Sequence, residues 1–232
     1  MSVKKLLYID DSKIPEQIGN LRKKLKSRGF ELDEVFIDLG TDDFKVRDDE
    51  EKIILDKEKI HRFIKDNYSN QNFDIIASDY DFKDPNLDGY ELLRRIKRDS
   101  ESQKYKFRRA KFCLYSADQD TVAKIFDTPS KIKELIKLKI DDFIKRENIP
   151  VELTELFTET DKTYSFKNHL MQYLEKYGEE KFKSVYPKFK DKYLAEIAHE
   201  IDKDLPNGIE FQKTLVELTI AHLIELNNFT KE

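Results

Sequence analysis

The sequence is poor in the residues that mark several common classes of protein. Its 232 residues include one cysteine, Cys113, so an intrachain disulfide is excluded. That cysteine stands in the apolar run KFCLYSA, where a buried thiol of low reactivity is expected. No apolar run approaches the length of a membrane-spanning helix, and the one near the N-terminus is too short for a signal peptide. These absences predict a cytoplasmic protein without a membrane partner.

Signatures of several enzyme classes are missing as well. The chain contains no P-loop, no dinucleotide-binding fingerprint and no nucleophile elbow. Its four histidines lie apart from one another and from any cysteine pair, so no zinc pattern is present. Charge, in contrast, is abundant: 39% of the residues are charged and 38% are hydrophobic, a balance typical of a folded and highly charged protein.

Strand-like and helix-like segments alternate in the first part of the chain. Five strand-like runs are expected, at KLLYID, ELDEVFIDL, FDIIASD, AKFCLYSA and KIDDFIK. Apolar residues recur at helical spacing between them, as in the segment from Ile14 to Leu25. Strands separated by helices predict an α/β domain with a five-stranded, doubly wound parallel sheet. The polar segment 41–52 is expected to be a solvated loop.

The pattern changes after Pro150. Residues 151–232 show no convincing strand pattern, so we predict two domains: an α/β domain at 1–149 and a small all-α domain at 150–232. Helices are expected in this second domain near 162–177, 179–190, 191–203 and 209–228. The wide apolar face of the last helix is typical of a helical core or of a protein interface.

The charge of the C-terminal region bears on its partners. Residues 150–232 contain 11 Lys and Arg against 16 Asp and Glu, whereas residues 1–149 contain 32 against 31. A DNA-binding module normally presents a basic face, which this acidic region lacks. No DNA binding is therefore expected, and a protein partner for the C-terminal helices is predicted instead.

Polar residues follow the predicted strands. Asp10 and Asp11 end the first strand and Asp79 the third, and the carboxyl ends of parallel strands share one rim of the sheet. Three carboxylates close together need a counterion, and oxygen ligands of this kind suit Mg²⁺. Ser116 and Lys145 end the fourth and fifth strands, and they add a hydroxyl and an ammonium group. Together these residues predict a phosphoryl-binding site with a nucleophilic carboxylate.

Four motifs carry a resemblance to a known family. LLYIDDS, DIIASDYDF…DGYELLRRIK, CLYSA and DDFIK, in that order, resemble the receiver domain of response regulators in two-component signalling. The resemblance covers roughly residues 3–149. It implies a flavodoxin-like fold, Mg²⁺ binding and phosphorylation of an aspartate by a histidine kinase, a phosphotransfer protein or a small phosphodonor. It implies no enzyme activity beyond phosphoryl transfer to, and hydrolysis from, that aspartate.

The resemblance also implies roles for single residues. Asp10 and Asp11 would hold the metal, Ser116 would donate a hydrogen bond to a phosphoryl oxygen, and Lys145 would pair with the phosphoryl charge. Phe143 would be the aromatic residue that turns inward when the site is phosphorylated.

One spacing departs from the family. Lys145 lies two residues after Phe143, whereas the family usually places lysine three residues after this aromatic residue, where Arg146 stands here. Either cation fits the role.

Two aspartates compete for the role of phosphoacceptor. The spacing from Asp74 favours Asp79, whereas counting back from Asp88 and Gly89 selects Asp81. Choosing Asp79 requires a longer loop, but choosing Asp81 requires burial of an unpaired Asp79 carboxylate, which costs more. We predict Asp79 as the acceptor and keep Asp81 as the alternative. In the first case Asp81 would offer its backbone carbonyl to the metal.

These features predict a response regulator-like signalling protein. Phosphorylation would switch protein contacts of the receiver and of the helical domain, with a histidine kinase or phosphotransfer protein upstream and a protein partner downstream. A homodimer is a further candidate assembly. The alternative is a degenerate pseudoreceiver that acts as a scaffold or adaptor without phosphorylation. A more distant alternative is an enzymatic output of the helical domain, for which the sequence shows only scattered acids and single histidines.

Overall fold

The chain forms two compact units. The computed structural model describes residues 2–118, 126, 128–162, 166–183 and 186–229. The first unit spans Met1–Thr160 and the second spans Asp161–Glu232. Each unit has a hydrophobic core of its own.

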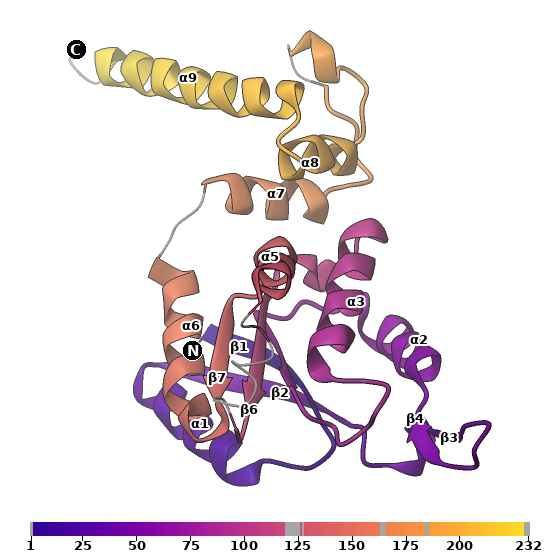
Figure 1. Ribbon diagram of the computed structural model, residues 1–232. Helices are drawn as coiled ribbons and strands as arrows, with labels where there is room; N and C mark the ends of the chain where they lie inside the picture. The colour runs from indigo at the N-terminus through magenta and orange to yellow at the C-terminus, as the bar shows by residue number, and fades with distance from the viewer. Residues whose placement is uncertain (1, 119–125, 127, 163–165, 184–185, 230–232) are drawn as a thin grey trace. The chain divides into compact units, whose positions relative to one another are not determined.

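A five-stranded parallel sheet organises the first unit (Figure 1). Its strands are β1 (Ser2–Asp10), β2 (Phe30–Asp38), β5 (Ile75–Asp79), β6 (Lys111–Ser116) and β7 (Asp142–Lys145). They lie in the order β2-β1-β5-β6-β7, and all neighbouring pairs are parallel. With the five strands counted along the chain, this is the order 2-1-3-4-5 of flavodoxin-like folds. The predicted fold class is confirmed.

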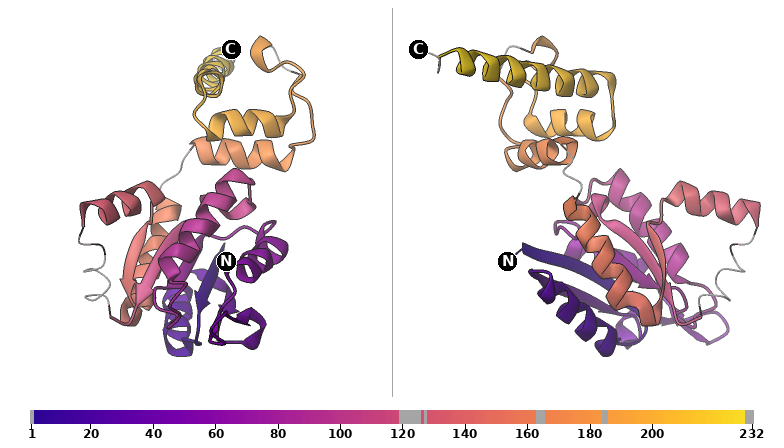
Figure 2. Two further views of the ribbon diagram at one scale, coloured as in Figure 1. Left: turned by 45° about the vertical axis from the view of Figure 1, so that its right-hand side comes forward. Right: turned by 90° about the vertical axis from the view of Figure 1, so that its left-hand side faces the viewer.

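Helices cover both faces of the sheet (Figure 2). They are α1 (Pro15–Ser27), α2 (Lys57–Tyr68), α3 (Gly89–Ser102), α5 (Pro129–Leu138) and α6 (Ile149–Lys162). Successive residues of a strand point to opposite faces, so Leu6 and Tyr8 of β1 pack with α1 and α6, whereas Leu7 and Ile9 pack with α2 and α3. This arrangement leaves the carboxyl ends of the strands at one rim.

Helix α6 belongs to the first unit. Its residues Leu153, Leu156 and Phe157 are buried in the same hydrophobic cluster as α1. Pro150 stands in the first turn of this helix, where a missing amide hydrogen costs no hydrogen bond. The proline therefore begins a helix that packs on the sheet, and the compact unit extends to Thr160, beyond the domain limit expected at 149.

Residues 42–55 form an insertion between β2 and α2. A 3₁₀ turn (Asp42–Phe44) leads into the antiparallel pair β3 (Lys45–Arg47) and β4 (Ile53–Leu55). Phe44 and Leu55 are buried in the core, and the amide of Leu55 donates to the Asp84 carboxylate at 2.6 Å. Residues 41–52 are therefore mostly exposed, as expected, but they are not an irregular loop, because Phe44 is buried and β3 forms one strand of a hairpin.

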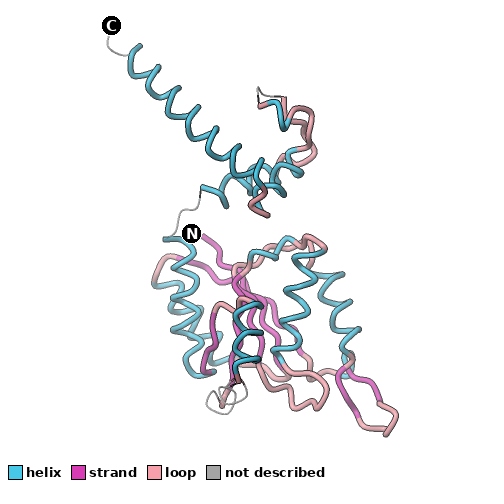
Figure 3. Tube along the Cα trace, turned by 45° about the horizontal axis from the view of Figure 1, so that its top comes forward, coloured by secondary structure: helices cyan, strands magenta, loops and turns pink. Residues whose placement is uncertain are grey.

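The second unit is helical, as predicted (Figure 3). Its helices are α7 (Phe166–Lys176), α8 (Leu194–Asp202) and α9 (Pro206–Phe229). They share a core formed by Met171, Leu174, Phe189, Ile197, Ala198, Ile201 and Phe211. None of the helices that the structure describes is long and apolar enough to cross a membrane.

One predicted helix of this unit is wrong. Within 179–190, the described residues contain only a 3₁₀ turn at Pro187–Phe189, and Lys181 forms a β-bridge with Tyr193. Pro187 lacks the amide that a helix interior needs, and the bridge holds the backbone extended. The segment is therefore a loop whose aromatic residue Phe189 fills the core.

Candidate functional site

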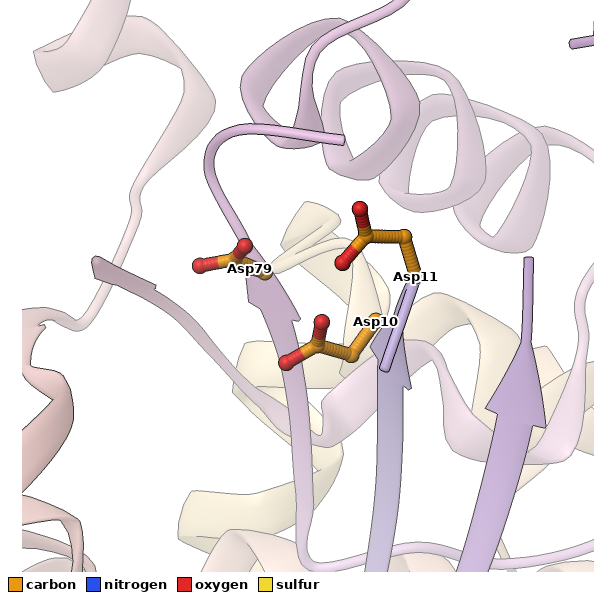
Figure 4. A group of neighbouring side chains, drawn as sticks. All are labelled: Asp10, Asp11 and Asp79. Carbon is orange, nitrogen blue, oxygen red and sulfur yellow. The ribbon is translucent and has the colours of Figure 1, made fainter. Parts of the chain in front are cut away.

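Three carboxylates converge where β1 and β5 end (Figure 4). Asp10 is the last residue of β1, Asp79 is the last residue of β5, and Asp11 follows β1 directly. One oxygen of each lies within 4.8 Å of the others. Asp10 is fully buried and Asp79 is 3% exposed. The structure thus brings together the three acids that the sequence predicted to share one rim.

Hydrogen bonds fix the Asp10 carboxylate. The amide of Ser12 donates to Oδ1 at 3.0 Å, and the hydroxyl of Tyr115 donates to Oδ2 at 2.8 Å. Burial raises the pKa of Asp10, and these two hydrogen bonds oppose that effect. Burial and the charge of Asp10 also raise the pKa of Tyr115 well above its ordinary value, so the phenol remains a donor.

Tyr115 is a site residue that the sequence analysis missed. It precedes Ser116 at the end of β6 and is the register partner of Asp79. The signal was a tyrosine in a run otherwise typical of a buried strand, because a buried phenol normally needs a hydrogen-bond partner. Its partner is an acid two strands away in the sheet order.

Arg146 is the cation that meets the acceptor candidate. Its Nη2 atom lies 2.8 Å from Oδ2 of Asp79 and 3.6 Å from Oδ2 of Asp10. Lys145, the cation first assigned to the phosphoryl group, has its Nζ atom 2.8 Å from the Glu147 carboxylate. Arg146 stands three residues after Phe143, where the family usually places its lysine, and it is the cation that contacts Asp79.

The environment of Asp79 shifts its protonation. Burial and the neighbouring charge of Asp10 raise the pKa of Asp79 to about 7, although Arg146 lowers it. A positive charge placed beside such a carboxylate stabilises its ionised form. The pocket is therefore suited to bind a cation and to hold a nucleophilic carboxylate.

Asp81 stands apart from this cluster. Strand β5 ends at Asp79, and the exposed Asp81 accepts a hydrogen bond from the amide of Lys83 at 2.8 Å. Its carboxylate therefore stabilises the turn at the start of the loop that leads to α3. The structure thus contains the strand ending at Asp79 and the lengthened loop that the choice of Asp79 required.

Gly89 permits α3 to begin close to the site. A Cβ atom at this position would lie 1.8 Å from the carbonyl oxygen of Asp79, so a larger residue would displace the strand end. Asp88 caps the helix, because its carboxylate accepts from the amide of Glu91 at 2.7 Å. Asp88 and Gly89 therefore allow α3 to begin close to the end of β5.

Ser116 and Phe143 occupy the neighbouring strands. Ser116 ends β6, is 4% exposed and accepts a hydrogen bond from the amide of Asp118 at 3.1 Å. Phe143 of β7 is partly buried and packs against the core on the α2 and α3 side of the sheet. Both residues thus lie on strands that lead to the rim, as predicted.

A cavity of about 220 Å³ adjoins the acidic cluster. Asp11 lines it, together with residues of the β3–β4 hairpin and of the loop after β5, including Lys45 and Lys83. This cavity gives solvent and small ions a route to the partly buried Asp11. The oxygen-only donor set of the three acids fits a hard divalent cation such as Mg²⁺.

The comparisons with known proteins found similarity only at the level of structure. No protein-family model matches the chain, and no curated protein matches it. Similar solved structures include RcsB from Salmonella enterica serovar Typhimurium bound to promoter rprA, with 13% identity and a TM-score of 0.37 over 86% of this chain and 89% of that one. Full-length FixJ from B. japonicum has 18% identity and a TM-score of 0.40 over 76% of this chain and 66% of that one.

An orphan response regulator of H. pylori is also similar, with 14% identity and a TM-score of 0.33 over 66% of this chain and 96% of that one. All these TM-scores are low, so the assignment of the fold rests on the sheet order and on the residues at its rim. In these two respects the chain resembles the receiver domain of response regulators, here followed by a helical C-terminal unit.

Proposed function

We propose that this chain is a response regulator-like signalling protein in which Asp79 accepts a phosphoryl group in a Mg²⁺-dependent reaction. One observation carries the proposal: Asp10, Asp11 and Asp79 converge within 4.8 Å at the carboxyl end of a 2-1-3-4-5 sheet. Ligands bind at this place in open α/β sheets. The protein would be cytoplasmic.

Each residue of the pocket has a role in this proposal. Asp10, Asp11, Asp79 and the backbone carbonyl of Asp81 would hold Mg²⁺, which when bound supplies positive charge that neutralises phosphoryl oxygens. An Oδ atom of ionised Asp79 forms a bond to phosphorus while the bond from phosphorus to the donor breaks, and the leaving group keeps the electron pair.

Cationic and hydroxyl side chains would stabilise the phosphoryl group. Arg146 would pair with its charge, because the guanidinium already lies 2.8 Å from Asp79, and Lys145 is kept as the second cation for this role. The hydroxyl of Ser116 would donate to a phosphoryl oxygen. Phe143 would turn inward as Ser116 moves, and this change would alter the protein contacts of the receiver.

The upstream partner in this scheme is a histidine kinase or a phosphotransfer protein. The downstream partner is a protein bound by the C-terminal helices. RcsB is bound to a promoter in its structure, but residues 150–232 of this chain carry 11 basic against 16 acidic residues. That acidic balance favours a protein partner over DNA as the output.

A second candidate function is a pseudoreceiver that acts as a scaffold without phosphorylation. The contact of Arg146 with Asp79 and Asp10 favours it, because an internal cation can offset the acidic charges without a metal. The receiver fold would then serve only as a docking module.

Intact-mass spectrometry distinguishes the two candidates. The purified protein is incubated with Mg²⁺ and acetyl phosphate, and binding of beryllofluoride is measured in parallel. A labile phosphoryl adduct is expected in the wild type and in Asp81→Asn, and its loss is expected in Asp79→Asn. An unmodified wild type that also fails to bind beryllofluoride would support the pseudoreceiver. An adduct lost only in Asp81→Asn would move the acceptor to Asp81.

A further inference from the structure

Helix α9 has an apolar face that its own unit does not cover. Phe211 and Leu215 of this helix pack on the core of the second unit. Six other large apolar residues of the helix are 40–56% exposed: Leu218 and the five residues Ile209, Val216, Ile220, Leu223 and Ile224. At about 100° per residue, these five positions fall in one stripe on the far side from Phe211 and Leu215. We call them the outer stripe.

The outer stripe continues where α9 leaves the rest of its unit. In Figures 1 and 3, the C-terminal half of α9 extends beyond α8, and no other described helix of the second unit lies beside it. Every residue from 216 to 225 is exposed. A helix with apolar residues on two opposite faces normally packs against protein on both of them. Among the described residues of its unit, α9 is covered only on the side of Phe211 and Leu215, and only along the part of the helix before residue 216.

The size of the outer stripe suits a protein partner. Its five side chains expose an apolar area on the order of 400 Å², which is as large as the largest patch on a typical monomer. Two such stripes packed together, with the stems of the flanking polar residues, would bury about 1,000 Å² in total, near the lower end for specific interfaces. Such a dimer would form reversibly and dissociate on dilution.

The spacing of the outer stripe is that of a two-stranded coiled coil. Val216, Ile220 and Leu223 are separated by four and three residues, and Ile209 lies one heptad before Val216. In this register Ile209, Val216 and Leu223 occupy d positions, whereas Lys213 and Ile220 occupy a positions. Only Ile220 at a with Leu223 at d is the combination that favours two parallel strands, because the d residues Ile209 and Val216 are β-branched. Lys213 is a polar residue at an a position, and such a residue specifies the register and the oligomeric state at a cost in stability.

The charges beside the outer stripe favour parallel pairing of two copies. One flank, the e positions, carries Glu210 and Glu217, and the other flank, the g positions, carries the uncharged Gln212 and Thr219. Parallel helices place the e flank of one copy against the g flank of the other, so each acid meets a neutral residue. Antiparallel helices would place the two acidic flanks together, which like-charge repulsion disfavours.

We propose that the outer stripe of α9 is the seam of a parallel homodimer, with a second copy of this chain as its occupant. The inference does not depend on phosphorylation of Asp79. It places the two copies of the helical unit side by side, with their α9 helices in the same direction.

The first test is the mass of the full chain in solution. Light scattering after size exclusion is expected to give twice the 27.7 kDa of one chain at high protein concentration, and a falling mass on dilution. Ile220→Glu places a charge in the seam and is expected to give the monomer mass. Leu218→Glu is the matched control, because Leu218 is 53% exposed on the same helix but lies outside the outer stripe. It is expected to remain dimeric.

The second test fixes the direction of the helices. Val216→Cys and Leu223→Cys, each alone, are expected to give disulfide-linked dimers under mild oxidation, because equivalent d positions meet in a parallel seam. Glu225→Cys on the opposite side of α9 is the control and is expected to remain uncrosslinked. The native Cys113 does not interfere, because it is fully buried in the first unit.

Several outcomes would overturn the proposal. A wild type that is monomeric at high concentration would mean that the outer stripe is covered by other parts of the chain or by another protein. A dimer that persists in Ile220→Glu, or that dissociates in Leu218→Glu, would place the interface elsewhere. Crosslinking at Glu225→Cys, or none at either d position, would exclude the parallel seam. Circular dichroism of each variant verifies that helix content is unchanged.

Discussion

Arg146 brings a charge that no ordinary pH removes to within 2.8 Å of Asp79. The same guanidinium lies 3.6 Å from Asp10, so it offsets part of the repulsion between two buried acids. Asp10 relies in addition on Tyr115 and Ser12, whereas the contact with Arg146 is the ion pair that opposes the raised pKa of Asp79. The balance of charge at the rim therefore depends on this arginine.

The Arg146→Ala variant is expected to lower stability in magnesium-free buffer at pH 8 by about 2 kcal/mol, because it leaves buried carboxylates without their cation. Added Mg²⁺ should then raise the melting temperature of the variant more than that of the wild type. Lys145→Ala is the matched control. Its exposed pair with Glu147 should contribute less than about 0.5 kcal/mol. Equal effects of the two substitutions in thermal melts would contradict the central role of Arg146.

The Asp79→Asn variant tests the raised pKa of Asp79. The folded value of about 7 lies above the ordinary value of 3.8, so the folded protein holds this proton more tightly than the unfolded chain does. The contribution of Asp79 to wild-type stability should therefore fall as pH rises from about 4 to 7 and level off above 7.

Without Mg²⁺, the free energy of unfolding of Asp79→Asn should be close to that of the wild type at pH 4 and about 3 kcal/mol higher at pH 8. Urea unfolding at both pH values measures this difference. Asp81→Asn, at an exposed position, should show no such trend. An Asp79→Asn variant that is no more stable than the wild type at pH 8 would show that the site carries no strain from like charges.

At the scale of elements, the start of α3 and the end of β5 are fitted to each other. Gly89→Ala is expected to destabilise the protein by more than about 2 kcal/mol, because the added Cβ would overlap the carbonyl of Asp79. Gly19→Ala is the control within a helix. No atom lies within 4 Å of its Cβ position, so this change should stabilise α1 by about 0.5–1 kcal/mol. Chemical unfolding of both variants compares them, and equal effects would argue against the close fit.

Elements with a clear period were predictable from the sequence. The runs that became β1, β5 and β6 are short, apolar and end in polar residues, and this pattern also placed Asp10, Asp11 and Asp79 at one rim. The hairpin at 42–55 was not predictable in this way, because its stability comes from two separated apolar residues, Phe44 and Leu55, that reach a distant core.

Long-range contacts also explain the other features that the sequence did not predict. Tyr115 meets Asp10 across two strands, which no local pattern encodes. Lys145 and Arg146 are adjacent cations, and only the turn of the backbone after β7 determines which of them reaches Asp79. The helix expected within 179–190 was wrong because a proline and a bridge between distant residues outweigh local propensity. Long-range contacts decide each of these cases.

At the scale of the whole molecule, the extent of the first unit has consequences for cutting the chain. A chain of residues 1–162 is expected to fold with its full cooperative transition, because it retains all of α6. A chain that ends at 149 loses Leu153, Leu156 and Phe157 from the core, and each buried side chain of this kind contributes about 2 kcal/mol. That shorter chain should melt earlier or aggregate. Thermal melts followed by circular dichroism compare the two, and equal melting temperatures would show that α6 adds nothing to the first unit.

The hydrogen bond from Tyr115 to Asp10 also gives the acidic pocket an optical signal. The chain contains no tryptophan, so its near-ultraviolet spectrum arises mainly from tyrosine and phenylalanine. Tyr115 is 1% exposed, and its phenol donates a hydrogen bond to Asp10, one of the carboxylates that would bind a cation. A cation that draws Asp10 toward itself would weaken this hydrogen bond and shift the absorption of Tyr115. The protein thereby contains a spectroscopic reporter of its own pocket, readable by difference absorption without a label.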